Sequence, residues 1–142
     1  MQISENFKLS EFEYSNTGIR YGVENKINGD ESVIANLTAL VTNVMQPLRD
    51  KINKPINITS GYRCPKLNKL VGGVENSQHL LGQACDFKIN GMRPYDIAKE
   101  ILDLGVVFDQ LILYPNFVHV SYNEQRNRKR VIYNSSYRGK RF

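Results

Sequence analysis

The sequence of 142 residues lacks any apolar run that approaches the roughly 20 residues needed to cross a bilayer. Its opening, MQISENFKLSEF, has neither the basic start nor the apolar centre of a secretory signal peptide. Internal repeats, low-complexity segments and interdomain linkers are also absent. These absences argue against a membrane-spanning or multidomain protein. We expect one soluble domain, residues 1–142, that is synthesised in the cytoplasm without a signal peptide.

Cysteine and histidine are both scarce, with two of each in the chain. Cys64 and Cys85 can form one bridge, but the sequence shows neither their separation nor their orientation. Two buried thiols are the simpler interpretation, because no secretory context is visible. A chain of this length buries roughly two-thirds of its unfolded surface, so it can hold a core without a disulfide.

Acidic residues nearly disappear at the C-terminal end, where the last nineteen residues hold seven Lys/Arg and one Glu. The formal net charge is +5, so the rest of the chain is close to neutral. We expect a basic C-terminal tail from about residue 124, although a basic run is often only a solvated face. An anionic bacterial wall polymer is the partner that we favour over nucleic acid, and we expect no membrane partner and a monomer.

Hydrophobic periodicity predicts an α+β fold in which N-terminal helices pack on a small, mainly antiparallel sheet. Asp30 or Ser32 can cap a helix whose last turn Pro47 should bend or interrupt. The apolar residues of this helix recur at three- and four-residue spacing and form a core-facing stripe: Val33, Leu37, Leu40, Val41, Val44 and Leu48. The other expected elements are a strand over INITSGY, a short helix from Pro65 to Leu70, a strand over ACDFKI, a helix over 94–104, and a hairpin of DQLILY and FVHVSY joined by Pro115 and Asn116.

Both histidines lie where they can contribute to a metal site. Catalytic zinc typically takes three protein ligands from His, Asp or Glu and leaves a fourth position open, and His79, Asp86 and His119 meet that number. Gly82 lets the chain turn between His79 in a loop and Asp86 on the next strand. Strand alternation directs Cys85 away from Asp86, so we do not count Cys85 as a ligand. One His and one Asp at this spacing are usually only a surface turn, so the spacing alone does not establish the site.

A resemblance to a known family strengthens the metal hypothesis. SQHLLGQACD fits the pattern S-x-H-x-x-G-x-A-x-D of the zinc D-Ala-D-Ala metallopeptidases, the M15 family, whose fold resembles the hedgehog signalling domain. Four further stretches, FKLSEF, MQPLRD, ITSGYRCPKLNKLVGG and FDQLILYPNFVHVSY, are similar to the carboxypeptidase-like branch of that family. In order, the five blocks run from Phe7 to Tyr122.

The resemblance implies a Zn²⁺ ion on His79, Asp86 and His119, with Arg63 reading a carboxylate of the peptide substrate. A guanidinium presents a planar fork to a carboxylate; the alternative is that Arg63 is part of a surface ion pair. Ser77 and Gln83 lie beside the ligands, where they can orient the ligands or the substrate or have no role. Asn68 and the residues 71–73 look like scaffold, where small side chains let the backbone pass closely.

The sequence departs from the family pattern at Tyr114. Family members normally carry a glutamate, acting as general base, a few residues before the last zinc histidine, and Tyr114 takes that place here. If Pro115 and Asn116 form a two-residue loop, position 114 pairs with 117 and position 112 with 119. Tyr114 then lies on the same strand face as His119. A phenol with a pKa near 10 donates a hydrogen bond at neutral pH but accepts a proton poorly. We do not assign Asp109 as the base, because it lies about five residues back along that strand, roughly 17 Å.

Two functional hypotheses follow. The first is a zinc metallopeptidase, similar to an endolysin, that hydrolyses an amide bond in the peptidoglycan stem peptide as a D,D-carboxypeptidase or endopeptidase. In it Arg63 holds a carboxylate, and the zinc and Tyr114 stabilise the oxyanion. The second is a catalytically weak or inactive zinc-containing module, from a phage particle or another source, that binds the cell wall. In either case we expect the chain to act on the wall, after phage-mediated release if its origin is a phage.

Overall fold

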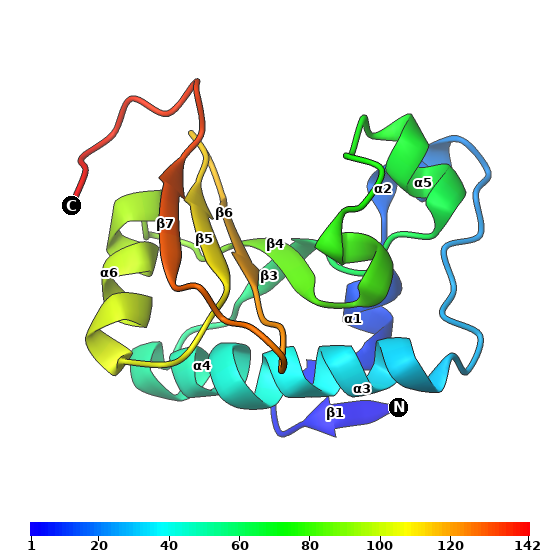
Figure 1. The fold of residues 1–142 in the computed structure, drawn as a ribbon, viewed down its shortest axis with the longest axis horizontal. Helices are drawn as coiled ribbons and strands as arrows, with labels where there is room; N and C mark the ends of the chain where they lie inside the picture. The colour runs from blue at the N-terminus through cyan, green and yellow to red at the C-terminus, as the bar shows by residue number, and fades with distance from the viewer.

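A computed structural model of residues 1–142 confirms the α+β class. In Figure 1 a long helical segment runs along one side of the molecule, and the sheet and the shorter helices rise from it. The helices are α1 (Leu9–Glu13), α2 (Asn16–Arg20), α3 (Glu31–Leu40), the π-helix η1 (Val41–Met45), α4 (Gln46–Ile52), α5 (Pro65–Leu70), the 3-10 helix η2 (Gln78–Leu81) and α6 (Pro94–Leu104). The strands are β1 (Gln2–Ser4), β2 (Phe7–Lys8), β3 (Asn57–Ser60), β4 (Ala84–Lys88), β5 (Gln110–Leu113), β6 (Val118–Ser121) and β7 (Arg130–Tyr133).

The main sheet has five strands in the order β3-β4-β6-β5-β7. All neighbouring pairs are antiparallel except β5 and β7, which are parallel. Strands β5 and β6 form the predicted hairpin with the predicted register, in which Ile112 lies opposite His119. The pairing of β4 with β6 places Asp86 opposite His119. Antiparallel pairing thus brings two of the candidate metal ligands together across the middle of the sheet.

The long segment α3–η1–α4 begins at its predicted cap, where the Asp30 carboxylate accepts the backbone N–H groups of Ser32 and Val33. The interruption expected near Pro47 takes the form of the π-helical turn Val41–Met45, after which the helix continues through Pro47 to Ile52. Proline has no N–H to donate, and the wider turn accommodates this loss. The apolar stripe faces the core as predicted, with buried Val33, Leu37, Leu40, Val41, Val44 and Leu48.

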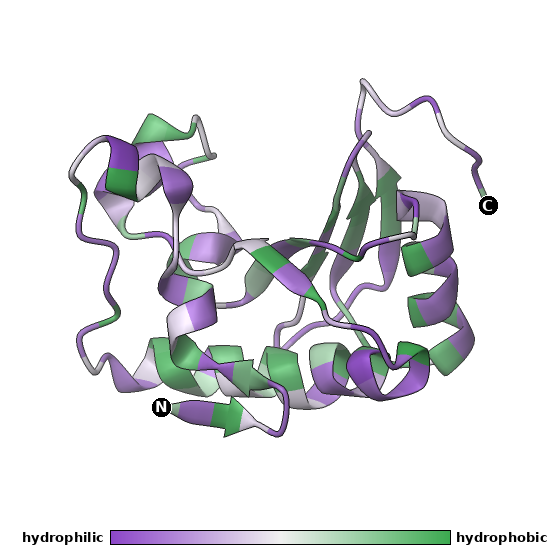
Figure 2. Ribbon diagram, turned by 180° about the vertical axis from the view of Figure 1, so that it is seen from behind, coloured by the Kyte–Doolittle hydropathy of each residue, from purple (hydrophilic) through white to green (hydrophobic).

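Helix α6 has the predicted bounds, from Pro94 to Leu104, and Gly105 ends it with a φ of 70°. Its buried residues Ile97, Ala98 and Ile101 belong to the same hydrophobic core as strands β4, β5 and β6. Figure 2 shows the strands beside α6 as the most continuously hydrophobic part of the ribbon, whereas the long helical segment alternates between the two colours. Helix α6, the long helical segment and the sheet therefore share one hydrophobic core.

The segment from about residue 124, which we expect to be a basic tail, is partly built into the fold. Residues 130–133 form β7, and Tyr137 is 2% exposed within the core. The backbone N–H of Phe142 donates to the Tyr133 hydroxyl at 2.8 Å, and the Phe142 ring stacks on Tyr95. Apolar and aromatic residues thus anchor this segment, while its basic side chains remain on the surface.

Neither cysteine takes part in a disulfide. The Cys85 side chain is buried, with its Sγ 3.7 Å from Sδ of Met45, whereas Cys64 is partly exposed. Of the two alternatives for the cysteines, the structure therefore contains the free thiols. Among the helices, none combines the length and apolar character that a bilayer crossing requires.

Candidate metal centre

Three side chains from two neighbouring strands and a short helix converge at one point. Asp86 lies on β4, His119 on β6 and His79 on η2. Oδ1 of Asp86 lies 2.9 Å from Nδ1 of His119 and 3.3 Å from Nε2 of His79. The two imidazole rings meet edge to face, with centroids 5.1 Å apart. The structure thus brings together the three residues that the sequence predicts as metal ligands.

His79 is held in place by the backbone around it. Its Nδ1 lies 2.7 Å from the carbonyl oxygen of Gly61, so Nδ1–H donates to that oxygen and Nε2 stays available toward Asp86. Gly82 has a φ of +74°, in the left-handed region that glycine favours, and a Cβ there would lie 2.8 Å from the carbonyl oxygen of Val33. The predicted turn at Gly82 is therefore present, and it carries the chain from His79 into β4.

The electrostatics of the site suit a cation. Burial by itself raises the pKa of the Asp86 carboxyl, but hydrogen bonds with His119 and His79 hold that pKa well below its ordinary value. The pKa of His79 is lowered, mainly by burial and further by the nearby His119 and Arg63, although Asp86 opposes this effect. The site therefore presents a carboxylate together with a neutral imidazole that has a lone pair to offer.

The donor set fits zinc by its chemistry and its spacing. Two imidazole nitrogens and one carboxylate oxygen are ligands that zinc accepts, and the three donor atoms all lie within 4.8 Å of one another. In a tetrahedral site with bonds of about 2.0–2.1 Å, neighbouring ligand atoms lie about 3.3 Å apart. The two distances from Asp86 Oδ1, 2.9 and 3.3 Å, are close to that spacing. The residues present can therefore hold one such ion.

Arg63 lies beside this centre and is largely buried. Its Nη2 lies 3.4 Å from Oδ2 of Asp86, its Nε donates to the Ser60 hydroxyl, and its Nη1 donates to the Asn68 amide oxygen. Burial lowers the pKa of Arg63, and the nearby Asp86 opposes that effect. A guanidinium carries five N–H groups, so these three bonds leave others to bind a ligand. Arg63 thus faces the site as a fixed cation.

Ser77 and Gln83 have different surroundings. The Ser77 hydroxyl accepts the backbone N–H of His79 and caps η2, so Ser77 positions a metal ligand through the backbone. The Gln83 amide oxygen accepts a hydrogen bond from the Gln78 side chain at 3.3 Å. Both residues line the cavity beside the metal ligands, where a bound substrate can reach them.

Asn68 and Gly73 form a tight scaffold contact next to Arg63. The Asn68 side-chain N–H donates to the carbonyl oxygen of Val74 at 2.9 Å. A Cβ added at Gly73 would overlap the Asn68 amide, so only glycine fits there. This packing keeps the Asn68 amide oxygen where it accepts a hydrogen bond from Arg63.

A cavity of about 730 Å³ opens over the three candidate ligands. The segment between α5 and η2 lines one side of it, and β5, β6 and the chain after β6 line the other. Tyr114 is among the lining residues and stacks on Phe117, with ring centroids 4.3 Å apart. Burial raises the pKa of Tyr114, and the Asp86 carboxylate raises it further. The hydroxyl of Tyr114 therefore keeps its proton at neutral pH.

Asp109 lines the same cavity, and its partner Arg128 is a residue that the sequence analysis does not identify. Arg128 donates two hydrogen bonds to the Asp109 carboxylate, from Nε to Oδ1 at 2.7 Å and from Nη2 to Oδ2 at 3.0 Å. The side-chain bond from Arg128 holds the pKa of Asp109 below its ordinary value. The carboxylate is therefore ionised and engaged, consistent with leaving Asp109 out of the role of general base. No local pattern points to this pair, because 19 residues separate its members.

We expect Arg128→Ala to lower the free energy of unfolding, because the Asp109 side chain is 1% exposed and would lose its charged partner. Urea denaturation measures this loss. The double variant Asp109→Asn, Arg128→Ala should lose less than the sum of the two single variants, since no uncompensated buried charge remains. Additive losses would show that the pair is not coupled.

A family model described as Peptidase M15 matches residues 5–121. The matched region contains the three candidate metal ligands together with Arg63 and Tyr114. No curated protein matches the chain significantly. The match covers most of the chain and ends at the last residue of β6, before β7 begins.

Proposed function

Because the chain belongs to the Peptidase M15 family, we propose that it is a zinc metallopeptidase that hydrolyses an amide bond in the stem peptide of peptidoglycan. The observation that carries the proposal is the buried cluster of His79, Asp86 and His119 at the base of an open cavity. The similarity of its sequence blocks to the carboxypeptidase-like branch supports a finer proposal, that the chain belongs to that branch. We therefore propose an activity of the D,D-carboxypeptidase or endopeptidase type.

The side chains that line the site have different roles in this proposal. His79, Asp86 and His119 would hold the zinc ion, which would supply Lewis-acid chemistry for the hydrolysis. Arg63 binds a carboxylate of the substrate and so aligns the peptide along the cavity. Ser77 keeps His79 in position, and Gln83 offers its amide to the peptide.

Tyr114 replaces the usual glutamate in this proposal. Its protonated hydroxyl donates a hydrogen bond to the oxygen on which negative charge develops during hydrolysis. It cannot serve well as a general base, and the loss of such a base commonly costs about 10²- to 10⁴-fold in rate. Of the two carboxylates that line the cavity, Asp86 belongs to the metal cluster and Asp109 is bound by Arg128.

This shortage of a free carboxylate favours a second candidate function. In it, the chain is a catalytically weak or inactive module that keeps zinc for stability and binds the cell wall. Turnover separates the two candidates. Purified muropeptides incubated with the zinc-loaded protein should yield new fragments in mass spectrometry, and the fragment masses name the bond that is cleaved. Intact muropeptides after prolonged incubation would favour the binding module.

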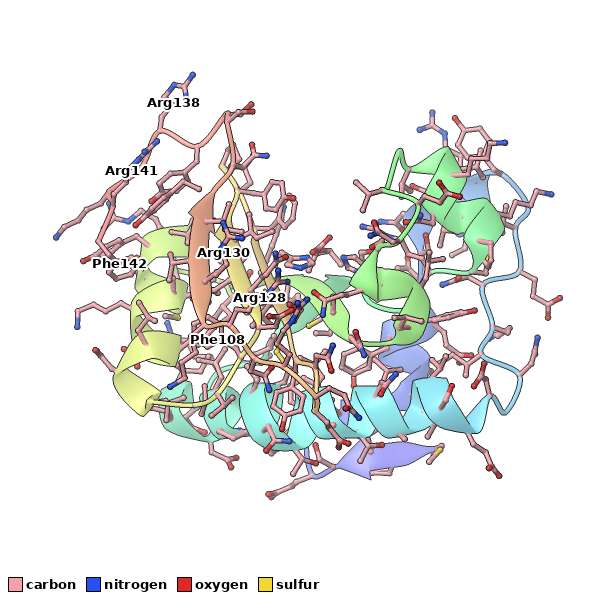
Figure 3. The ribbon with its side chains drawn as sticks, in the orientation of Figure 1. Phe108, Arg128, Arg130, Arg138, Arg141 and Phe142 are labelled. Atoms are coloured by element: carbon pink, nitrogen blue, oxygen red, sulfur yellow. The ribbon has the colours of Figure 1, made fainter.

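The basic side chains near the C-terminus support a further part of the proposal, attachment to an anionic wall polymer. Figure 3 shows Arg138 and Arg141 at the outer edge of the molecule beside Phe142. Lys140 lies over the Tyr95 ring and Arg141 over the Tyr133 ring. Aromatic rings therefore support these cations while their charges stay accessible. We propose that the protein acts on the wall as an endolysin-like enzyme.

We expect Arg138→Gln, Lys140→Gln, Arg141→Gln to weaken attachment to wall material while cleavage of a small soluble peptide is unchanged. The three substitutions lower the formal net charge from +5 to +2 and leave the buried Tyr137 intact. Sedimentation with purified walls at increasing salt measures the attachment. The control Lys26→Gln, Lys54→Gln, Lys88→Gln makes the same charge change at exposed sites elsewhere. Equal loss in both triple variants would assign the effect to net charge alone.

A further inference from the structure

The cavity beside the metal centre contains one cation for which the fold provides no anionic partner. Arg63 is paired with Asp86 at 3.4 Å, and Arg128 is paired with Asp109 at 2.7 Å. These two pairs use both carboxylates that line the cavity. Arg126 lines the same cavity, is exposed, and forms neither an ion pair nor a side-chain hydrogen bond. The cavity therefore has an excess positive charge located at Arg126.

The loop that carries Arg126 is held at both ends. Before it, the backbone N–H of Tyr122 donates to the carbonyl oxygen of Gln83 at 2.9 Å. After it, the backbone N–H of Arg128 donates to the Asp109 carboxylate at 3.1 Å, in addition to the side-chain bonds of that pair. A backbone that is already ordered reduces the entropy that ligand binding would cost. The backbone that carries Arg126 is thus held in place at the edge of the cavity.

The opposite side of the cavity carries three exposed aliphatic side chains among polar residues such as Ser77 and Gln78. Val71, Val74 and Leu81 line it and are 41%, 67% and 50% exposed. In Figure 3, Arg128 lies near the middle of the molecule, whereas Arg138 and Arg141 lie beside the C-terminus. The cations of the cavity are therefore separate from those proposed to attach to the wall polymer. A cavity with this lining suits a ligand that is aliphatic on one side and anionic on the other.

We propose that Arg126 is a specificity-determining residue that binds a second carboxylate of an acidic peptide substrate, distinct from the carboxylate bound by Arg63. This inference rests on the proposed function, because it places a peptide in the same cavity. A guanidinium recognises a carboxylate through paired, charge-assisted hydrogen bonds. All the guanidinium N–H groups of Arg126 are free to bind a carboxylate. Some of those of Arg63 and Arg128 already donate hydrogen bonds within the protein.

The test compares two peptides that differ in one charge. One is a stem-type peptide that contains a γ-linked glutamate with a free α-carboxylate, and the other has a carboxamide in place of that carboxylate. We expect the zinc-loaded protein to cleave the acidic peptide with a kcat/KM about three- to tenfold higher, a preference that declines as salt is added. Arg126→Gln should abolish the preference, and Arg126→Lys should keep part of it.

Arg130→Gln is the matched control, because Arg130 is exposed on β7 and does not line the cavity. This variant should keep the full preference of the parent. Equilibrium binding of the same two peptides, measured by fluorescence anisotropy, separates this inference from the proposed function. If neither peptide is cleaved but Arg126→Gln removes a binding preference, the inference holds and the peptidase function fails. A parent without preference in either assay, or an Arg126→Gln variant that retains the preference, overturns the inference.

Discussion

Replacing His119 with alanine is expected to remove the zinc and with it the hydrolytic activity. The substitution leaves only two of the three donors, and the chain has no third histidine to take over. Loss of an outer partner of a metal ligand commonly costs about 10- to 100-fold in metal affinity, so loss of a ligand should cost more. Metal analysis after dialysis should find about one zinc per chain in the parent and far less in the variant.

A thermal measurement gives a second readout that does not depend on activity. Added zinc should raise the melting temperature of the parent, because the ion binds the folded state, and it should have little effect on His119→Ala. Cys64→Ala is the control for a thiol ligand, since Cys64 lies outside the cluster and is partly exposed. It should retain the zinc of the parent. Full zinc stoichiometry in His119→Ala would falsify this ligand set.

Tyr114→Glu is expected to raise the rate of amide hydrolysis by about tenfold or more, if the missing general base limits the reaction. The substitution puts a carboxylate among the residues that line the cavity, on the same strand face as His119. Zinc content should stay near one per chain, because the three ligands are untouched. The lost ring stack on Phe117 should cost only about 0.5–1.5 kcal/mol of stability.

Tyr114→Gln is the matched control for this gain, because glutamine has the size of glutamate but cannot accept a proton as a base. It should be no faster than the parent. Tyr114→Phe then tests the hydroxyl: a slower variant shows that the phenol stabilises the oxyanion, and an unchanged rate shows that the ring only packs against Phe117. A folded, zinc-bound Tyr114→Glu variant with the rate of the parent contradicts the hypothesis, since the base must then come from another group.

Local chemistry alone is enough to predict much of the scaffold. Helix α6 has its predicted bounds because Pro94 suits a first helical turn and Gly105 adopts the left-handed conformation that ends the helix. The Asp30 cap depends only on the residues just after it. The hairpin register, with Ile112 opposite His119, follows from the short connection at Pro115 and Asn116. Each of these features involves residues close together in the chain.

The residues of the candidate site could be predicted from the sequence, but the contacts that hold them in position could not. The positions of His79, Asp86 and His119 relative to the family pattern point to a metal site, and strand alternation correctly directs Cys85 away from it. The Gly61 carbonyl that positions His79 carries no side-chain signal in the sequence. It reaches His79 only because the chain after β3 passes alongside η2, 18 residues further on.

The sequence by itself thus determined the helix ends, the hairpin and the identity of the candidate ligands, because these depend on neighbouring residues and on side-chain chemistry. Only the tertiary structure decided that residues 130–133 join the sheet in parallel beside β5, instead of extending as a basic tail. It also decided that Arg128 neutralises Asp109 and leaves Arg126 as the unpaired cation of the cavity. Contacts of this kind join residues that are distant along the chain, and their pairing depends on the path of the backbone between them, which composition and periodicity do not specify.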